Sequence, residues 1–362
     1  MPPMSRTSLP EQVAEHLRES IQQGRWSDRL PGVSLLAAEL DVARHTIRRA
    51  LQLLEAEGLV GGRGLGRSRC IAAAGGSAAL RRSLRVAILR HDKNLGDNPQ
   101  TSMVLTQIMH SLKTAGHEVS FCKKSQLELR NDVGRIARHL ATTAADAWVV
   151  ESGSYPLLEW CATRPTPCLA LYGRTGDKPL ARTGPDTAPA LRSATRHLVA
   201  LGHRRIVLIT RTSHRKPTPG RSERAFLEEL ASHGVVSGDY NLPDWKETPE
   251  GFHQLLSNLF KSTPPTALII DEIPHFFAAV AFCARHGIRV PDQVSLVSTD
   301  CDAMLDWCHP GFAHLRWDNA LIVRRVVRWV NDVRIGKPDR KTINFPAEFV
   351  PGGSTGPANV AS

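Results

Sequence analysis

The chain has 362 residues, which is enough for two or three domains that each bury a core. Its 41% hydrophobic and 22% charged residues are ordinary for a soluble globular protein, and the net charge of +11 weakly favours a polyanionic partner. Because no apolar run of membrane-spanning length and no apolar N-terminal segment occurs, we expect no membrane span, no signal peptide and a cytoplasmic protein.

A pair of helical segments is predicted between residues 30 and 58. A short apolar segment over 35–40 is followed by a break at Asp41 and Val42 and then by a second helical run. In that run the apolar residues recur at the spacing of one buried helix face: Ile47, Ala50, Leu51 and Leu54. The other face carries side chains that suit the major groove of DNA, where guanidinium groups bond phosphates or guanine: Arg44, His45, Arg48, Arg49 and Gln52.

Residues 59–71 follow as a predicted β-hairpin wing. Its glycines allow close approach to a backbone, and Arg63, Arg67 and Arg69 have no acidic neighbour. The alternative is a solvated arginine face on an ordinary helix pair. Because the arginine-bearing helix, the break before it and the wing occur together, DNA binding is favoured.

The segment from Gln12 to Ile71 resembles the winged helix-turn-helix of GntR-type bacterial transcription regulators. Residues 43–48 (ARHTIR) are similar to the start of the family's recognition helix, and residues 54–59 (LEAEGL) to its end. Val33 and Ser34 stand where the family has a Glu-Arg pair, so one usual phosphate contact is missing. The resemblance and the polar helix face together imply a set of DNA contacts: Arg44, His45, Thr46, Arg48 and Arg49 from the helix, and Gly64 and Arg67 from the wing.

After a first domain over 1–73, a small-residue stretch predicts an interdomain linker over 74–84. Apolar runs and helical runs then alternate, and the continuous apolar character of the runs is typical of parallel strands buried on both faces. The length of this region favours two sheets with a cleft between them. The predicted strands are 86–90, 147–150, 168–172, 206–210, 267–271 and 294–298, and the predicted helices are 102–115, 131–143, 187–201, 221–233, 249–261, 275–287 and 318–335.

The region 85–354 resembles the effector domain of LacI-type regulators, a relative of periplasmic sugar-binding proteins. Residues 194–210 (ATRHLVALGHRRIVLIT) and 286–295 (HGIRVPDQVS) are similar to two segments of that family, and 346–354 to its closing segment. The resemblance implies a two-lobed, periplasmic-binding-protein-like α/β domain with parallel sheets. The GntR-like module replaces the DNA-binding headpiece and hinge helix of that family. The composition of 355–362 predicts a flexible tail.

By this resemblance a small molecule binds between the lobes, where the carboxyl ends of strands line the crevice. Carboxylates accept hydrogen bonds from sugar hydroxyls, and an aromatic ring covers the apolar face of a sugar. Because Asp271 and Glu272 stand where the family has Asn-Asp, a polyol, a sugar or a cation suits this site better than an anion. The expected effector-binding residues are His91, Asp92, Glu151, Ser152, Arg221, Trp245, Asp271 and Asp300.

Several of these assignments have structural alternatives. Asp300 could cap a turn, Asp271 could be the N-cap of the helix after Pro274, and Trp245 could belong to the core. His91 could be an ordinary loop residue. The family's pocket arginine is Ser222 here, and Arg221, one position away, is the expected substitute.

No catalytic motif is found, and the cysteines have no zinc-binding spacing. We therefore expect no enzyme activity, no metal and no cofactor, with all thiols reduced: Cys70, Cys122, Cys161, Cys168, Cys283, Cys301 and Cys308.

The sequence as a whole predicts a sequence-specific transcription regulator, expected to be a repressor. A homodimer would bind a pseudo-palindromic DNA operator, and a small molecule such as a sugar would modulate this binding. Two alternatives stay open. One is a ligand-free architectural DNA binder whose α/β domain only dimerises. The other is a GntR-type regulator with an aminotransferase-like domain, for which this chain is short.

Overall fold

The structure, a computed structural model, describes residues 8–22, 25–26, 30–56, 59–61, 70–71, 83–92, 99–176, 178–216 and 218–358. The chain divides into two units, residues 1–82 and residues 83–362. None of the helices in these described ranges is long and apolar enough to cross a membrane.

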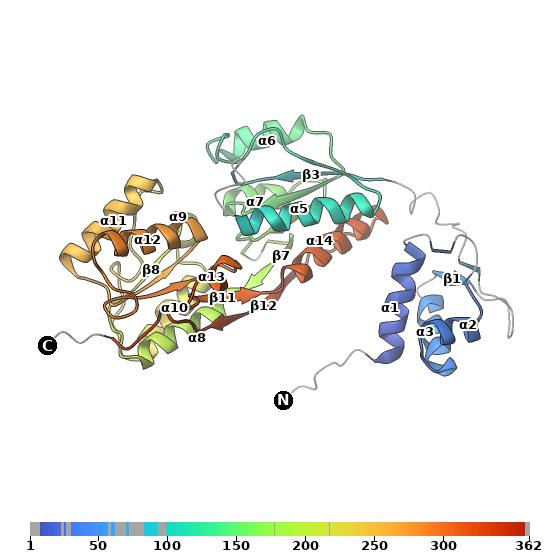
Figure 1. Cartoon of the computed structure of the whole chain (residues 1–362). Coiled ribbons are helices and arrows are strands. Elements are labelled where there is room, and N and C mark those ends of the chain that lie inside the picture. The colour runs from blue at the N-terminus through green and yellow to red at the C-terminus, as the bar shows by residue number, and fades with distance from the viewer. Residues whose placement is uncertain are drawn as a thin grey trace. The chain divides into compact units, whose positions relative to one another are not determined.

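The first unit contains helices α1 (Leu9–Gln22), α2 (Val33–Glu39) and α3 (Arg44–Ala56) (Figure 1). Asp41 has a φ of 49°, in the left-handed region, and makes the predicted break between α2 and α3. The predicted apolar face of α3 is confirmed, because its members pack with Leu17 and Leu36 in the core: Ile47, Ala50, Leu51 and Leu54. Strands β1 (Val60–Gly61) and β2 (Cys70–Ile71) pair antiparallel, as a wing requires.

The second unit has two halves, which we call lobe 1 and lobe 2. Lobe 1 contains strands β3 (Arg85–Leu89), β4 (Glu118–Phe121), β5 (Ala147–Glu151), β6 (Cys168–Leu171) and β7 (Ala181–Asp186), with helices α5 (Pro99–Thr114), α6 (Val133–Ala141), α7 (Tyr155–Ala162) and α14 (Asn319–Arg334). Lobe 2 contains strands β8 (Ile206–Ile209), β9 (Ala267–Ile270), β10 (Ser295–Ser298) and β11 (Ala313–Trp317), with helices α8 (Thr187–Ala200), α9 (Thr212–Arg215), α10 (Arg221–Ser232), α11 (Pro249–Ser262), α12 (Ile273–Arg285) and α13 (Met304–Trp307).

Strand β12 (Thr342–Val350) joins the two lobes (Figure 1). Its first part pairs parallel with β7, and from Ala347 onward it pairs antiparallel with β11. Pro346, which has no N–H to donate, lies where the strand changes partner. The expectation of two separate sheets is therefore corrected to one mostly parallel sheet, in the order β4-β3-β5-β6-β7-β12-β11-β10-β9-β8.

Helices cover both faces of the sheet, which explains the continuous apolar strands. In lobe 1, α5 and α14 pack on one face and α6 and α7 on the other. In lobe 2, α8 and α10 cover one face and α11 and α12 the other. Each strand predicted from sequence is present within one residue of its expected ends.

Several of the elements that sequence patterns missed lack a continuous apolar run. Edge strand β4 alternates exposed and half-buried residues, and β7 contains Gly184 and Pro185. Helices α9 and α13 have only four residues each. Short or interrupted segments take their structure from their neighbours rather than from local periodicity.

The expected tail begins at residue 355. In the structure, residues 355–358 form hydrogen bonds with lobe 2. The Ala358 amide donates to the Leu201 carbonyl at 2.8 Å, and the Gly356 amide donates to the Ser295 hydroxyl at 3.1 Å. Buried polar groups need partners, and the buried Ser295 finds one here. At the other end, Leu84 is buried in the core of lobe 1, while residues 74–82 of the expected linker lie outside the described residues.

Candidate nucleic-acid interface and interlobe cleft

Helix α3 presents an exposed basic face. Arg44, His45, Arg48 and Arg49 are exposed, whereas the apolar face beneath them is fully buried. Among the described residues no acidic side chain forms an ion pair with Arg44, Arg48 or Arg49, so their charge is available to phosphates.

Two parts of the expected DNA-contact set stand apart from this face. Thr46 is only 3% exposed, so its side chain lies in the core rather than on the polar face. Its neighbour Ile47 is buried as well, because both positions lie on the inward side of the helix. Gly64 and Arg67 lie outside the described residues, between the paired strands β1 and β2.

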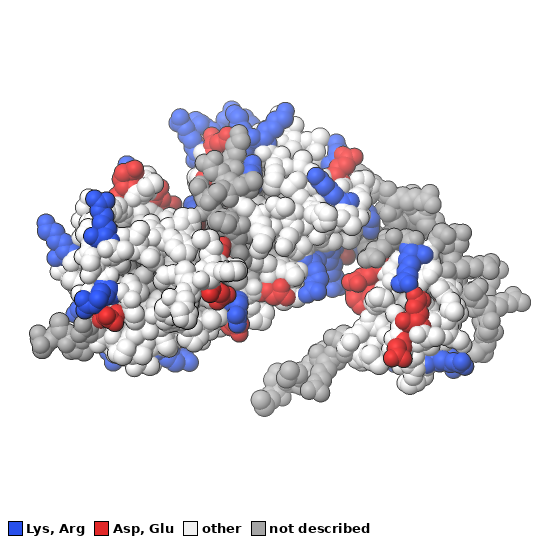
Figure 2. Space-filling model, viewed as in Figure 1, with Lys and Arg blue, Asp and Glu red and all other residues white. Residues whose placement is uncertain are grey.

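Helix α1 carries the opposite charge. Glu11, Glu15 and Glu19 recur every four residues and are exposed, which places them on one helix face. Acidic side chains appear on the α1 side of the first unit in Figure 2. An acidic face repels phosphates, whereas the basic face of α3 attracts them.

In the second unit, polar residues at the carboxyl ends of the lobe 1 strands meet those at the carboxyl ends of the lobe 2 strands. His91 and Asp92 follow β3, Glu151 ends β5 and Ser152 comes after it. In lobe 2, Arg211 follows β8 closely, Asp271 follows β9, and Asp300 follows β10. This is the position where ligands bind in open α/β sheets.

Arg211 of lobe 2 reaches His91 of lobe 1. Its guanidinium pairs with both oxygens of Glu272, with Nη2 and Oε2 2.8 Å apart, and its Nη1 lies 3.4 Å from Nε2 of His91. Burial and the Arg211 charge lower the pKa of His91, which keeps the imidazole neutral against the guanidinium.

Glu151 supports this contact from lobe 1. Its carboxylate accepts the His91 amide, and its side chain is buried, which raises its pKa. Gln126 donates to the Glu151 carbonyl at 2.6 Å and fixes the end of the strand. The cleft therefore holds a buried carboxylate beside a neutral imidazole.

Asp271 is the centre of a hydrogen-bond network in lobe 2. It accepts from Thr210 Oγ1 at 3.0 Å, from Thr299 Oγ1 at 3.1 Å and from His214 Nδ1 at 3.2 Å. Burial alone would lower the pKa of His214, but Asp271 raises it to about 9, and the charged histidine holds the pKa of Asp271 well below its usual range. The N-cap alternative for Asp271 is wrong, because Glu272 precedes α12.

Asp300 lies near Tyr172, which comes from the other lobe. Burial, the Asp300 charge and the Glu151 charge all raise the pKa of Tyr172. Asp300 Oδ1 also accepts the Cys301 amide at 2.9 Å, so the same side chain caps the turn after β10. The turn-capping and cleft-facing interpretations of Asp300 are thus compatible.

Trp245 and Arg221 are placed differently from the other expected residues. The indole N–H of Trp245 donates to the Thr210 carbonyl at 3.0 Å, and its ring meets Phe252 edge-on at 5.3 Å between centroids, which is a packing arrangement. Arg221 is 64% exposed and pairs with Asp186 at 2.9 Å. Arg211 rather than Arg221 contacts His91 of the other lobe, and the expected use of Arg221 is not supported by its position.

Sequence reasoning missed Arg211, Tyr172 and His214. Arg211 directly follows the predicted strand 206–210 and Tyr172 ends the predicted strand 168–172, so the rule that selected His91 would also have selected them. The backbone is strained just after three of these strands, where non-glycine residues have positive φ: Ser152 at 46°, Tyr172 at 67° and Glu272 at 64°.

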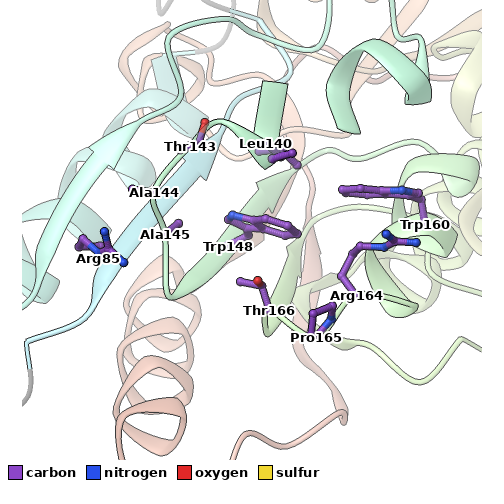
Figure 3. A pocket seen from close by; sticks show the side chains of 11 residues that line it. Arg85, Leu140, Thr143, Ala144, Ala145, Trp148, Trp160, Arg164, Pro165 and Thr166 are labelled. Atoms are coloured by element: carbon purple, nitrogen blue, oxygen red, sulfur yellow. The ribbon is translucent and has the colours of Figure 1, made fainter. Parts of the chain in front are cut away.

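A separate hollow of about 370 Å³ lies at the amino-terminal edge of the lobe 1 strands (Figure 3). Trp148 and Trp160 stack there with centroids 5.9 Å apart, and the Arg164 guanidinium lies 4.9 Å from the centre of the Trp160 ring. Arg85, at its rim, pairs with Asp146. None of the interlobe residues lines this hollow, so it is distinct from the cleft.

Metal ligation has no support within the described ranges, where no three His, Cys, Asp or Glu side chains are arranged to hold an ion. Six cysteines are free thiols, and most are buried: Cys122, Cys161, Cys168, Cys283, Cys301 and Cys308.

Comparison with known proteins agrees with both units. Residues 9–65 match the model of the bacterial regulatory proteins of the gntR family, and residues 195–355 match that of the periplasmic binding protein-like domain. No curated protein sequence matches the chain.

Solved structures show the same fold at low identity. The transcriptional regulator CelR in complex with cellobiose is 18% identical over 90% of this chain and 100% of its own, with a TM-score of 0.64. A LacI-family regulator from Enterococcus faecium with bound ribose is 15% identical over 76% and 100%, with a TM-score of 0.61. Another from Bifidobacterium animalis subsp. lactis is 22% identical over 76% and 98%, with a TM-score of 0.59. The chain is a DNA-binding transcription regulator that joins a domain of the gntR family to a periplasmic-binding-protein-like effector domain with the fold of LacI-family regulators.

Proposed function

We propose that α3 enters the major groove of a specific operator. Arg44, His45, Arg48 and Arg49 read or bond the DNA from the exposed face of the helix, because guanidinium forks match both phosphate and guanine geometry. Gly64 and Arg67 of the wing bond the backbone beside it. The observation that supports this assignment is the unpaired basic face of α3, opposite a fully buried apolar face.

The active species is a homodimer acting as a repressor on a pseudo-palindromic operator. One chain offers one recognition helix, and two-fold pairing of chains matches two half-sites about one helical turn of DNA apart.

The effector is a neutral hydroxylated small molecule, such as a sugar or polyol, bound between the lobes. Glu151, Glu272 and Asp300 supply carboxylate oxygens for hydroxyl groups at the strand edge, and His91, Asp92, Ser152, Asp271 and Trp245 surround or support them. Two structural relatives were solved with a bound sugar, one with cellobiose and the other with ribose. An anionic ligand is disfavoured, because Arg211 and His214 are already engaged by Glu272 and Asp271.

Regulation follows if the effector binds one lobe arrangement more tightly than the other. Since β12 and the neighbouring segments join the lobes, a change in lobe closure alters the surfaces available for pairing two chains. Such a change would shift the spacing of the two recognition helices on the operator.

A thermal-shift screen of the full-length protein tests the effector assignment. The panel holds sugars, polyols and amines, and each neutral sugar is matched to its phosphate ester. A true effector at about 100 times its Kd should stabilise the fold by about 2.7 kcal/mol. We expect shifts from neutral compounds and none from their phosphates. A protein that binds a selected operator but shifts with no compound would be an architectural DNA binder.

A further inference from the structure

Arg174 connects the two lobes through main-chain carbonyls. It lies in the loop after β6, two residues beyond Tyr172, and therefore belongs to lobe 1. Its Nη1 donates to the Ser213 carbonyl at 2.9 Å and to the His214 carbonyl at 3.2 Å, and its Nη2 donates to the Thr218 carbonyl at 3.1 Å. All three acceptors belong to lobe 2, in and just after α9.

The acceptors explain why an arginine suits this position. The last carbonyls of a short helix have no N–H partners within the helix. A guanidinium presents several N–H groups in a rigid fork and can bond more than one carbonyl at once, which a lysine cannot do in the same geometry. The Gly220 amide also donates to the His214 carbonyl, at 2.8 Å, so this turn of lobe 2 is held from both sides.

The segment that Arg174 holds carries two side chains of the interlobe contact region. Residues 210–218 contain Arg211, which contacts His91 of lobe 1, and His214, which bonds Asp271. Arg174 therefore forms hydrogen bonds with one part of this segment, and Arg211 at its start contacts His91. Both contacts run directly between protein groups of the two lobes.

We propose that Arg174 is an interlobe latch, which holds lobe 2 against lobe 1 and must release for the lobes to move apart. If the cleft binds an effector as proposed above, the latch sets how readily that molecule enters and leaves. The latch itself needs no effector, so its test can be separated from that of the proposed function.

Hydrogen exchange of the full-length, ligand-free protein, followed by mass spectrometry, tests the latch. We compare wild type with Arg174→Gln, which removes the charged fork, and with Arg174→Lys, which keeps the charge without the fork. Arg164→Gln is the matched control, because the contacts described for Arg164 lie within lobe 1, with Thr163 and Trp160. Two reporter segments are followed: residues 210–220 in lobe 2 and 89–92 in lobe 1.

In Arg174→Gln we expect both reporter segments to exchange faster, by about tenfold, as for the loss of a charge-assisted hydrogen bond. Arg174→Lys should lie between this variant and wild type, and Arg164→Gln should match wild type. Faster exchange confined to 210–220 would make Arg174 a local cap and overturn the latch. Unchanged exchange at both segments would overturn it too. If Arg174→Gln exchanges faster everywhere, because its fold is lost, the lysine variant decides by the same two segments.

Discussion

Nη1 of Arg211 in lobe 2 lies 3.4 Å from Nε2 of His91 in lobe 1, so the imidazole must be neutral for the two lobes to meet here. Two carboxyl groups support this contact. Glu272 pairs with the Arg211 guanidinium, and Glu151 accepts a hydrogen bond from the His91 amide.

The first prediction concerns this contact at acidic pH. Because the pKa of His91 is lowered from 6.5 in the folded protein, the unfolded chain binds the proton more readily, and stability should fall as the pH drops below 6.5. His91→Gln keeps a hydrogen-bond acceptor but cannot be protonated, so part of this acid sensitivity should disappear. Urea unfolding of both proteins between about pH 7.5 and 5 measures the effect. The exposed His110→Gln is the control, and identical pH dependence in wild type and His91→Gln would contradict the prediction.

The second prediction concerns alkaline pH. The pKa of His214 is raised from 6.5 to about 9 by Asp271, so its stabilising contribution is complete below 6.5 and is lost as the pH rises through about 9. His214→Gln should be less stable than wild type at pH 6.5 and should lack the decline above it. Tm measured across this range tests both statements. An equally steep decline in the variant would show that another group titrates.

The third prediction concerns operator recognition. Arg48→Ala should weaken specific binding by about 1–3 kcal/mol per half-site and leave the fold intact, because the side chain is exposed and packs against nothing in the core. Affinity for an operator selected from a random duplex pool is measured beside circular dichroism. Arg18→Ala in α1 is the control. Unchanged operator affinity in Arg48→Ala would refute α3 as the reading helix.

The fourth prediction concerns the wing. Arg67 lies outside the described residues, and its role rests on the glycine- and arginine-rich sequence between β1 and β2. Arg67→Ala should weaken specific and non-specific DNA binding alike and reduce the salt dependence by about one unit of slope. Titrations at several salt concentrations provide the measurement. Loss of discrimination at a single base pair, with the slope unchanged, would mean that the wing reads bases.

The fifth prediction separates the two roles of Asp300. Asp300→Asn retains a side-chain oxygen that can accept the Cys301 amide, so the turn should survive. A carboxylate bond to an effector hydroxyl contributes about 1.5–3 kcal/mol, and the variant should therefore lose tenfold or more in effector affinity. Calorimetry with a compound found by the thermal-shift screen, together with operator binding with and without it, tests this. Wild-type affinity in the variant would remove Asp300 from the site.

The sequence by itself determined the elements whose character is local. The spacing of Ile47, Ala50, Leu51 and Leu54 predicted the buried face of α3, and the six apolar runs predicted six strands, because helix and strand periods are written in consecutive residues. The apolar runs also placed His91, Asp271 and Asp300 at or just after the ends of strands, and the structure has each of them after a strand: β3, β9 and β10.

Only the tertiary structure decided which of those residues meet. Thr46 turns inward although it matches a family position, and Arg221, one position from the family's arginine, turns outward, since burial depends on what packs against each side chain. The contacts of Arg211 with His91 and of Arg174 with the segment after α9 join residues 40 or more positions apart. They exist because β12 changes partner at Pro346 and ties the two lobes together, and no local pattern records which distant strands become neighbours.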